Sequence, residues 1–347
     1  EMTPNKQIEK VEGELFQLAE KGRYDGGFQN FSSALSASIQ MAGEAYQRDG
    51  GLSGLATGLD DLDRQMGGLQ KSDLIILAGR PAMGKSSLAT NIAFNIAKAW
   101  KGEVTPDGHT KTVNGGVAAF FSLEMSAEQL ATRMLAEQAE ISSSDIRRGR
   151  IHDSQFSKLV DVSNMMSQLP LYIDDTGGLS VAQVAARARR LKRQKGIDFI
   201  VIDYLQLLSG STKASSQNRV QELTEITTTL KALAKELEVP IMALSQLSRQ
   251  VEARDDKHPQ LADLRESGSI EQDADVVLFV YREEYYLKNK EPKEGTPEHM
   301  TWQGDMEKVH GKAEIIIGKQ RHGPTGTVQL SFEAQFTRFG NLARADY

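Results

Sequence analysis

The sequence predicts an α/β protein with a mostly parallel central sheet and helices on both faces. From about residue 55 onward, apolar runs of strand length alternate with long helical stretches, the runs being residues 74–78, 117–122, 171–173, 199–202 and 241–245. Parallel strands need a crossover connection, usually a helix, and this alternation provides one. Three further runs follow without long helices between them, at 276–281, 313–317 and 328–332. We expect these to add strands at one edge and to make the sheet mixed on its C-terminal side.

Two helical segments are predicted before the alternating region. Residues 4–22 carry apolar side chains at spacings of three and four, as in an amphipathic helix, and the Gly-rich segment 22–27 ends that pattern. Residues 28–48 repeat it with the stripe Phe31, Leu35, Ile39, Ala42 and Tyr46. Neither helix has enough apolar partners to form a core of its own. The residues alone leave two alternatives for the second helix, packing on the same chain or docking on a neighbouring subunit.

Composition excludes several classes of protein. The 347 residues contain no Cys, which excludes a disulfide framework, a thiol nucleophile and a cysteine zinc site, and the six His lack metal-ligand spacing. No apolar stretch approaches the roughly 18 residues of a membrane helix, so we expect a cytoplasmic protein without a membrane span. The net charge of −6 excludes a globally basic nucleic-acid binder and leaves only local loops or a channel for such binding. Because the sequence opens directly on a helical pattern, we expect a further N-terminal domain in a longer chain.

Residues 79–86 read GRPAMGKS, a Gly-x4-Gly-Lys-Ser loop between an apolar strand and an Ala-rich helical stretch. In such a loop, main-chain N–H groups turn inward around nucleotide phosphates and the helix dipole favours their charge. Lys85 would reach the β and γ oxygens, and Ser86 would ligate Mg²⁺. We therefore predict an ATP site whose phosphates contact Arg80, Pro81, Ala82, Met83, Gly84, Lys85, Ser86 and Ser87.

Three polar side chains follow other apolar strands. Asp203 ends the run 199–202, Glu124 follows 117–122, and Gln246 follows 241–245. Carboxyl ends of parallel strands converge on one crevice, where Asp203 would hold Mg²⁺, Glu124 would deprotonate the attacking water and Gln246 would sense the γ-phosphate. Each alone is more often a turn or cap residue. Their common position relative to the phosphate loop favours the catalytic interpretation.

The remaining polar segments carry no predicted chemistry. Residues 101–115 and 287–311 lack periodicity, and we expect surface loops there. The basic runs 147–150 and 187–195 resemble polynucleotide sites, but no aromatic residues interleave with them. Charged helix faces are commonly just solvated, and we favour that interpretation for both runs.

The order of the motifs resembles that of a known family. TGLDDLDRQMGGLQKSDLIILAGRPAMGKSS, FFSLEMSAEQLATRML, IDYLQLL, SQLSR, DLRESGSIEQDADVV and GKQRHGPTG are similar to the C-terminal RecA-type motor of the bacterial replicative DNA helicase, the DnaB type, over roughly residues 55–335. The resemblance implies a RecA-type P-loop ATPase domain over 55–347. It also implies that 28–54 is a linker whose helix docks on the adjacent subunit, preceded by a helical remnant at 1–27.

The resemblance assigns roles to further residues. It agrees with the roles given above to Lys85, Ser86, Asp203 and Glu124. It adds Arg133, on the helix after Glu124, as a cis contact near the γ-phosphate, and it implies that Lys319 and Arg321 of GKQRHGPTG act in trans on a neighbour's ATP. Arg265, Glu266 and Gly268 of DLRESGS match positions that hold the DNA backbone. A second candidate for the channel is the polar segment 209–218.

The family implies a homohexamer that hydrolyses ATP with Mg²⁺ and moves 5′ to 3′ along single-stranded DNA, in the cytoplasm at the replication fork of the nucleoid. Primase and a helicase loader are the partners implied for the full-length protein. Two alternatives are a RecA-type recombination filament and a non-motor assembly module. The GKQRHGPTG and DLRESGS motifs favour the helicase over the filament. Glu124 argues against a module that uses ATP only to join subunits, because such a module needs no catalytic base.

Overall fold

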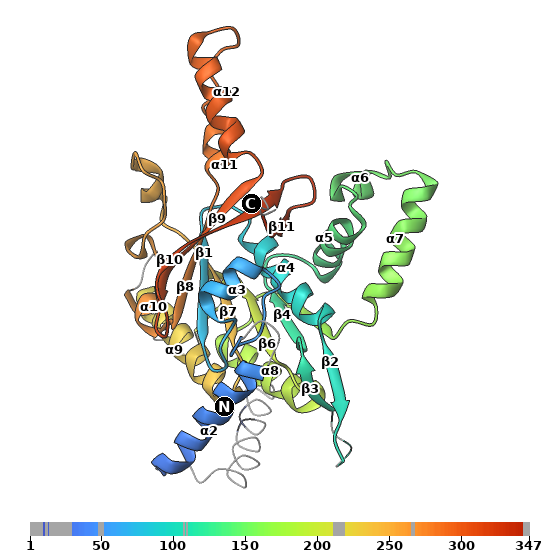
Figure 1. Ribbon diagram of the computed structural model, residues 1–347, viewed down its shortest axis with the longest axis vertical. Helices are drawn as coiled ribbons and strands as arrows, with labels where there is room; N and C mark the ends of the chain where they lie inside the picture. The colour runs from blue at the N-terminus through green and yellow to red at the C-terminus, as the bar shows by residue number, and fades with distance from the viewer. Residues whose placement is uncertain are drawn as a thin grey trace, which may run out of the picture.

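The computed structural model describes residues 10, 13, 30–47, 52–106, 108, 110–210, 219–264 and 268–342. Its centre is a nine-stranded sheet in the order β11-β10-β9-β8-β1-β7-β6-β4-β5 (Figure 1). Strands β8, β1, β7, β6, β4 and β5 pair in parallel, and β9, β10 and β11 continue antiparallel from β8. The strands are β1 (Leu74–Gly79), β4 (Ala118–Ser122), β5 (Leu171–Asp174), β6 (Phe199–Asp203), β7 (Ile241–Gln246), β8 (Val276–Tyr281), β9 (Lys312–Gln320), β10 (Gly326–Glu333) and β11 (Arg338–Gly340).

Helices cover both faces of this sheet because its central strands are apolar on both sides. In β1, Ile75 and Leu77 belong to one apolar cluster while Leu74, Ile76 and Ala78 belong to the other. The first cluster includes residues of α3 (Asp60–Met66), α4 (Lys85–Lys98) and α5 (Ala127–Ala139), and the second includes residues of α8 (Val181–Lys195), α9 (Arg219–Leu237) and α10 (Gly268–Asp273). The predicted mostly parallel α/β sheet, mixed on its C-terminal side, is confirmed.

One strand prediction is wrong. We expected residues 276–281 to join an added edge, but β8 pairs directly with β1 in parallel, with Ile75 opposite Val276. The connection from β7 to β8 uses 3-10 turns and the six-residue helix α10 rather than a long helix. The sequence between β7 and β8 therefore lacks the long helical pattern that usually indicates a parallel strand, although β8 is parallel to β1. The carboxyl end of β8 consequently lies beside the phosphate loop.

Both segments expected as surface loops contain regular structure. Residues 101–115 include the exposed hairpin β2 (Lys101–Val104) and β3 (Thr110–Asn114), attached to the body by a 2.9 Å hydrogen bond from Thr112 Oγ1 to Asp198 Oδ2. Residues 287–311 include α12 (Pro297–Val309), which projects with α11 (Glu283–Lys288) away from the sheet (Figure 1). Few apolar residues of either element enter the core, so neither produces the periodicity that we used for prediction.

The helix predicted over 28–48 is present as α2 (Phe31–Gln47), and its apolar stripe lies in solvent. Phe31 is 77% exposed, Ile39 68% and Tyr46 91%. The described part of the chain thus leaves this stripe uncovered. Nearly all of the helix predicted over 4–22 lies outside the described residues. The remaining helices are α6 (Ser143–Arg148) and α7 (Asp153–Met166), which pack near α5. Among the described helices, none combines the length and the apolar character that crossing a bilayer requires.

Candidate active site

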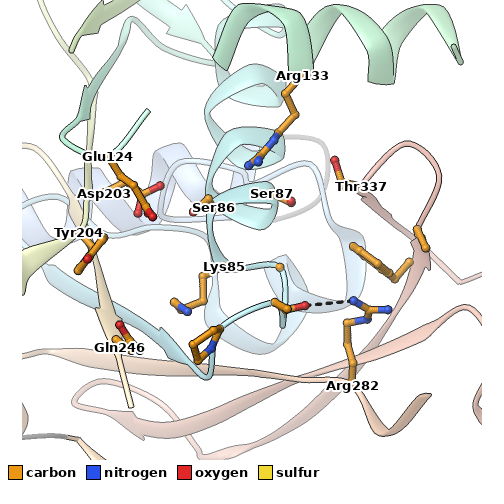
Figure 2. A pocket seen from close by; sticks show the side chains of 15 residues that line it. Lys85, Ser86, Ser87, Glu124, Arg133, Asp203, Tyr204, Gln246, Arg282 and Thr337 are labelled. Carbon is orange, nitrogen blue, oxygen red and sulfur yellow. Dashed lines mark hydrogen bonds between the residues drawn. The ribbon is translucent and has the colours of Figure 1, made fainter. Parts of the chain in front are cut away.

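The carboxyl ends of five strands meet around the phosphate loop, as the topology requires. The loop joins the end of β1 to the start of α4, and β8, β7, β6 and β4 end beside it. Together they enclose a cavity of about 490 Å³, within the range of small-molecule sites (Figure 2). The cavity is lined by Pro81, Ala82, Gly84, Lys85, Ser86, Ser87, Glu124, Arg133, Asp203, Tyr204, Gln246, Arg282, Phe332, Ala334 and Thr337.

The phosphate loop adopts a backbone that turns tightly into α4. Ala82 and Gly84 both have positive φ, 65° and 99°. A Cβ on Gly84 would lie 2.9 Å from the Phe339 ring, so glycine is required by close approach as well as by conformation. Helix α4 is almost fully buried from Ser87 to Ala97, which fixes its N-terminus against the cavity. Main-chain N–H groups and the positive end of the helix dipole are thereby available to an anion.

The loop lysine is held in place by its own loop. Lys85 Nζ donates a 3.1 Å hydrogen bond to the Arg80 carbonyl oxygen. Burial lowers the pKa of Lys85 to about 8, while the charges of Asp203 and Glu124 oppose that shift. A triphosphate would add further negative charge beside the ammonium group and favour its charged form. Burial also lowers the pKa of Arg133, which faces the same two carboxylates.

Two oxygen-bearing side chains could hold a divalent cation. Asp203 is 3% exposed, and burial raises the pKa of its carboxyl while a hydrogen bond from the Ser86 hydroxyl lowers it. Within the described chain no cluster of three or more acidic, His or Cys side chains forms a metal cage. Mg²⁺ in nucleotide sites usually takes one or two protein oxygens and completes its shell with phosphate and water. A hydroxyl and a carboxylate that line the same cavity therefore fit Mg²⁺.

The structure brings most of the predicted nucleotide-site residues together, with two differences in the loop. Glu124, Arg133, Asp203 and Gln246 all line the same cavity as Lys85 (Figure 2). Arg80 and Met83 are not among the lining residues, and the Met83 side chain is 1% exposed. Only their main chain is left to contact phosphate, so the prediction of a contact there concerns the backbone.

The Arg80 side chain is directed to the segment that follows β7. Its Nε donates to Glu252 Oε1 at 2.9 Å, and its Nη1 donates to the Leu247 carbonyl oxygen at 3.0 Å. Leu247 comes directly after Gln246, the candidate γ-phosphate sensor. Arg80 therefore connects the phosphate loop to the segment that follows Gln246. Only 12% of the Arg80 side chain is exposed.

Sequence reasoning missed five lining residues: Tyr204, Arg282, Phe332, Ala334 and Thr337. Arg282 follows β8, and the misplaced edge assignment of that strand concealed it. Its guanidinium carbon lies 3.9 Å from the centre of the Phe332 ring, and its Nη1 donates to the Ala82 carbonyl oxygen at 3.4 Å (Figure 2). Arg282 Nε is buried and has no hydrogen-bond partner within the part of the chain that the structure describes. An Arg ending an apolar run was the available signal.

Lys319 and Arg321 lie at the opposite end of β1 from the phosphate loop. The Arg321 N–H donates to the Asp275 carbonyl oxygen at 2.9 Å, and the Asp275 carboxylate accepts the N–H of Leu74, the first residue of β1. The phosphate loop follows Gly79, the last residue of that strand. Five residue steps of roughly 3.3 Å each put the two sites about 16 Å apart along the strand. The structure therefore does not bring these two side chains to the chain's own cavity.

The predicted DNA-binding residues are described only in part. Arg265 and Glu266 lie outside the described residues, and Gly268 is the first residue of α10. Lys319 Nζ donates to the carbonyl oxygens of Glu271 and Ala274, at 2.5 and 2.7 Å, at the C-terminal end of the same helix. The second candidate segment, 209–218, is described only at Ser209 and Gly210.

Comparisons with known proteins agree with one another. The family model described as the DnaB-like helicase C-terminal domain matches residues 54–341. The replicative DNA helicase DnaB of Rickettsia conorii is 46% identical over 342 residues, which cover 99% of this chain and 68% of that protein. The DnaB of Geobacillus stearothermophilus is 44% identical over 337 residues, covering 97% of this chain and 67% of that protein.

Two solved structures have the same fold. One is described as an ATPase domain; it is 33% identical and superposes with a TM-score of 0.76, covering 91% of this chain and all of that one. The other, a DnaB-like replicative helicase whose structure was reported with its interactions with primase, is 32% identical with a TM-score of 0.73. That alignment covers 97% of this chain and 72% of the helicase.

Proposed function

The chain belongs to the family of DnaB-like replicative DNA helicases, and from this membership we propose that it hydrolyses ATP at sites shared between the subunits of a homohexamer. It is an ATP-dependent DNA helicase with a RecA-like fold, and its cavity is a nucleotide site. The single observation that supports the shared site is the position of Arg321, about 16 Å along β1 from the phosphate loop of its own chain. An arginine that stabilises the transition state must approach the γ-phosphate, and Arg321 at the far end of β1 would have to approach the γ-phosphate of a neighbouring subunit.

Within one subunit, we propose that Glu124 is the general base and Gln246 the γ-phosphate sensor. Glu124 lines the cavity together with Lys85, and Lys85 and Arg133 are both partly buried cations of that cavity. Lys85 would bind the β and γ oxygens, and Arg133 would bind near the γ-phosphate. The main chain from Arg80 to Ser87 would surround the phosphates. Cations in this position stabilise the charge that develops as the γ-phosphoryl group is transferred.

Ser86 and Asp203 would hold Mg²⁺, Ser86 directly and Asp203 through water. When bound, the cation would neutralise part of the negative charge on the β- and γ-phosphates of ATP. Ser86 and Asp203 line the same cavity, and the Ser86 hydroxyl is near enough to the Asp203 carboxyl to lower its pKa, so the two candidate ligands are adjacent. The far end of the cavity, at Arg282, Phe332 and Thr337, has a buried guanidinium N–H without a partner among the described residues and would take the nucleoside part of ATP.

We propose the domain organisation that goes with this assembly. Residues 55–347 would form the motor, 28–54 the linker that docks on the neighbouring subunit, and 1–27 a helical remnant. The exposed stripe of α2 supports the linker role, because a stripe of large apolar side chains is ordinarily covered. Hexamer formation would thus rest on α2 and on the shared ATP sites.

Single-stranded DNA is the proposed track, held through its phosphates by Arg265, Glu266 and the main chain at Gly268, with movement 5′ to 3′. Binding of this kind is independent of sequence and weakens with salt. Primase is a proposed partner because the related DnaB-like helicase was reported with its interactions with primase. A helicase loader is a further proposed partner of the full-length protein. We place its work in the cytoplasm, at the replication fork of the nucleoid.

Mixing subunits tests the shared site. Steady-state ATP hydrolysis is measured with and without single-stranded DNA for the parent, for Arg321→Ala, for Glu124→Gln and for an equal mixture of the two variants. We expect both variants to be inactive alone and the mixture to regain activity, because some interfaces then combine an intact Arg321 with an intact Glu124. Normal hydrolysis by Arg321→Ala, with no effect of DNA on the parent, would contradict the proposal.

A further inference from the structure

A buried carboxylate, that of Asp275, lies against Arg321, the candidate trans-acting arginine. Asp275 comes directly before β8 and is 2% exposed, and Arg321 comes directly after β9. Strands β8 and β9 pair with Val276 opposite Gln320, so the register brings the two residues side by side. The Arg321 N–H donates to the Asp275 carbonyl oxygen at 2.9 Å, and Asp275 Oδ1 lies 3.5 Å from Arg321 Nε.

The Asp275 carboxylate is itself held in place from the other side. Its Oδ2 accepts the N–H of Leu74, the first residue of β1, at 2.8 Å, and the Lys231 ammonium at 2.5 Å. Lys231 Nζ also donates to the Ser72 carbonyl oxygen at 2.7 Å. The carboxylate cannot rotate without losing these buried bonds, which leaves Oδ1 directed to Arg321. Because Lys231 compensates the charge of Asp275, the carboxylate can hold Arg321 without cancelling its positive charge.

The Arg321 side chain is restrained near its base and open at its outer end. Nη2 donates to the Gln272 carbonyl oxygen at 3.1 Å, and Nε faces Asp275. The side chain is nevertheless 47% exposed, so a phosphate oxygen of another subunit can approach it. Arginine presents a planar set of N–H groups, and a guanidinium that is already held in one orientation loses less freedom when it binds.

We propose that Asp275 is a positioning residue for Arg321, holding the guanidinium in the orientation that meets the γ-phosphate of a neighbouring subunit's ATP. This inference rests on the proposed function, in which Arg321 completes a neighbour's site. It adds the residue that gives Arg321 its orientation. A catalytic group displaced by about 1 Å can lose on the order of a hundredfold in rate, so the carboxylate matters to the transition state more than to ATP binding.

A second role for Asp275 has to be separated from this one. The bond to Leu74 also supports β1, whose other end carries the phosphate loop of the same chain. Loss of the carboxylate could therefore damage the chain's own site rather than the neighbour's. The two roles differ in which subunit's ATP site fails, and mixing variants reveals that.

The test begins with Asp275→Asn in the whole chain. Asparagine keeps an oxygen that can accept the Leu74 N–H and removes the charge beside Arg321. Steady-state ATP hydrolysis is measured over a range of ATP concentrations, and the mass of the particle is compared with that of the parent. We expect kcat to fall by about tenfold or more while KM for ATP stays within about twofold, since the lost interaction belongs to the transition state.

Two mixtures then identify the site that fails. An equal mixture of Asp275→Asn with Glu124→Gln should regain up to about a quarter of the parental rate, because random rings hold intact pairs at that share of their interfaces. A mixture of Asp275→Asn with Arg321→Ala should regain nothing, because every interface then lacks a working arginine. Damage to the chain's own phosphate loop predicts the reverse result in both mixtures.

Asp198→Asn is the matched control. Asp198 Oδ2 accepts the N–H of Val117, directly before β4, at 2.9 Å, so it supports the start of a parallel strand as Asp275 does for β1. Strands β7 and β6 separate β4 from β1. We expect Asp198→Asn to keep the parental kcat. An equal loss of kcat in this control would show that support of the sheet is responsible, and the inference would fail.

The outcomes separate the inference from the proposed function. If the reference mixture of Arg321→Ala with Glu124→Gln regains no activity, the shared site is overturned, and the role of Asp275 with it. If that mixture regains activity, the shared site stands. An unchanged kcat in Asp275→Asn, no recovery with Glu124→Gln, or recovery with Arg321→Ala would then overturn the role of Asp275 alone. Recovery with Glu124→Gln and not with Arg321→Ala supports it.

Discussion

Asn91 Nδ2 donates a 2.5 Å hydrogen bond to Glu137 Oε2, joining the helix that carries the phosphate loop to the helix that carries Arg133. Asn91 also accepts the N–H of Phe339 at 2.7 Å, so the same amide fixes strand β11. Glu137 is 5% exposed. Burial raises its pKa to about 7, while Arg338 and the bond from Asn91 oppose the shift. The carboxyl thus lies one turn beyond Arg133 in a place that disfavours its charge.

The first prediction concerns the effect of pH on stability through Glu137. Its pKa is about 7 in the folded protein and 4.5 as the ordinary value, so folding favours the protonated form. The contribution of this group to stability is therefore greatest below pH 4.5 and is lost as the pH rises through 7. The loss is on the order of 3 kcal/mol at most. Glu137→Gln keeps an acceptor for Asn91 and removes the titration.

Urea unfolding at several pH values measures this difference. We expect Glu137→Gln to become more stable relative to the parent as the pH increases, with most of the change between about pH 5 and pH 7. Parallel stability curves for the two proteins would show that Glu137 does not titrate in this range in the folded state.

A second prediction concerns Gly84. Gly84→Ala places a Cβ 2.9 Å from the Phe339 ring at a φ of 99°, so contact and conformation both oppose it. We expect a loss of about 1–3 kcal/mol in unfolding free energy together with weaker nucleotide binding. Gly178→Ala is the control, because Gly178 also has positive φ, 68°, but has no atom within 4 Å of its Cβ position. Equal effects of the two variants would show that contact with Phe339 is unimportant.

The sequence predicted the fold well where long-range packing leaves a local pattern. The central strands are apolar on both faces because helices cover both sides, and that burial produces continuous apolar runs. Strand β8 has the same apolar character, but its order and direction depend on pairing with β1, which no local pattern records. The hairpin β2–β3 and helix α12 were wrongly predicted as loops for the opposite reason. They bury little, so they need no apolar periodicity.

The candidate site divides in the same way. Asp203 and Gln246 end recognisable strands and Lys85 follows the loop after another, so topology alone places them around one cavity. Predicting Arg282 as a site residue would have required the pairing of β8 with β1. Predicting Phe332 and Thr337 would have required the arrangement of the antiparallel strands at the edge of the sheet. The contact of Asp275 with Arg321 is also hidden in sequence, because it depends on the pairing of β8 with β9.

A third prediction concerns the hydrogen bonds between Lys319 and the C-terminal end of helix α10. In the described chain its ammonium binds the carbonyl oxygens of Glu271, within helix α10, and Ala274, directly after the helix. Lys319→Met removes these bonds and should destabilise α10 by about 1–2 kcal/mol, less than a buried charged bond is worth because the site is partly solvated. Hydrogen exchange at residues 268–273 would measure this. Arg321→Met is the control, since Arg321 makes one weaker bond to this helix, to Gln272 at 3.1 Å. Unchanged exchange in Lys319→Met would exclude the stabilising role.

The fourth prediction concerns the exposed stripe of α2. Phe31 and Ile39 are 77% and 68% exposed, and each would contribute about 1.5–3 kcal/mol if a neighbouring subunit covered it. Phe31→Asp combined with Ile39→Asp should therefore shift the proposed hexamer towards smaller species at a given concentration. Light scattering or native mass spectrometry across a dilution series would measure the shift.

Ser33→Asp is the control variant, which tests whether a negative charge anywhere on α2 is enough to weaken assembly. Ser33 is exposed on α2 and lies two residues from Phe31, so its side chain leaves the opposite side of the helix. A contact confined to the apolar stripe predicts that Ser33→Asp assembles like the parent while the double Asp variant does not. If all three proteins assembled alike, α2 would have no part in the hexamer interface, and the subunits would have to associate through the ATPase domains alone.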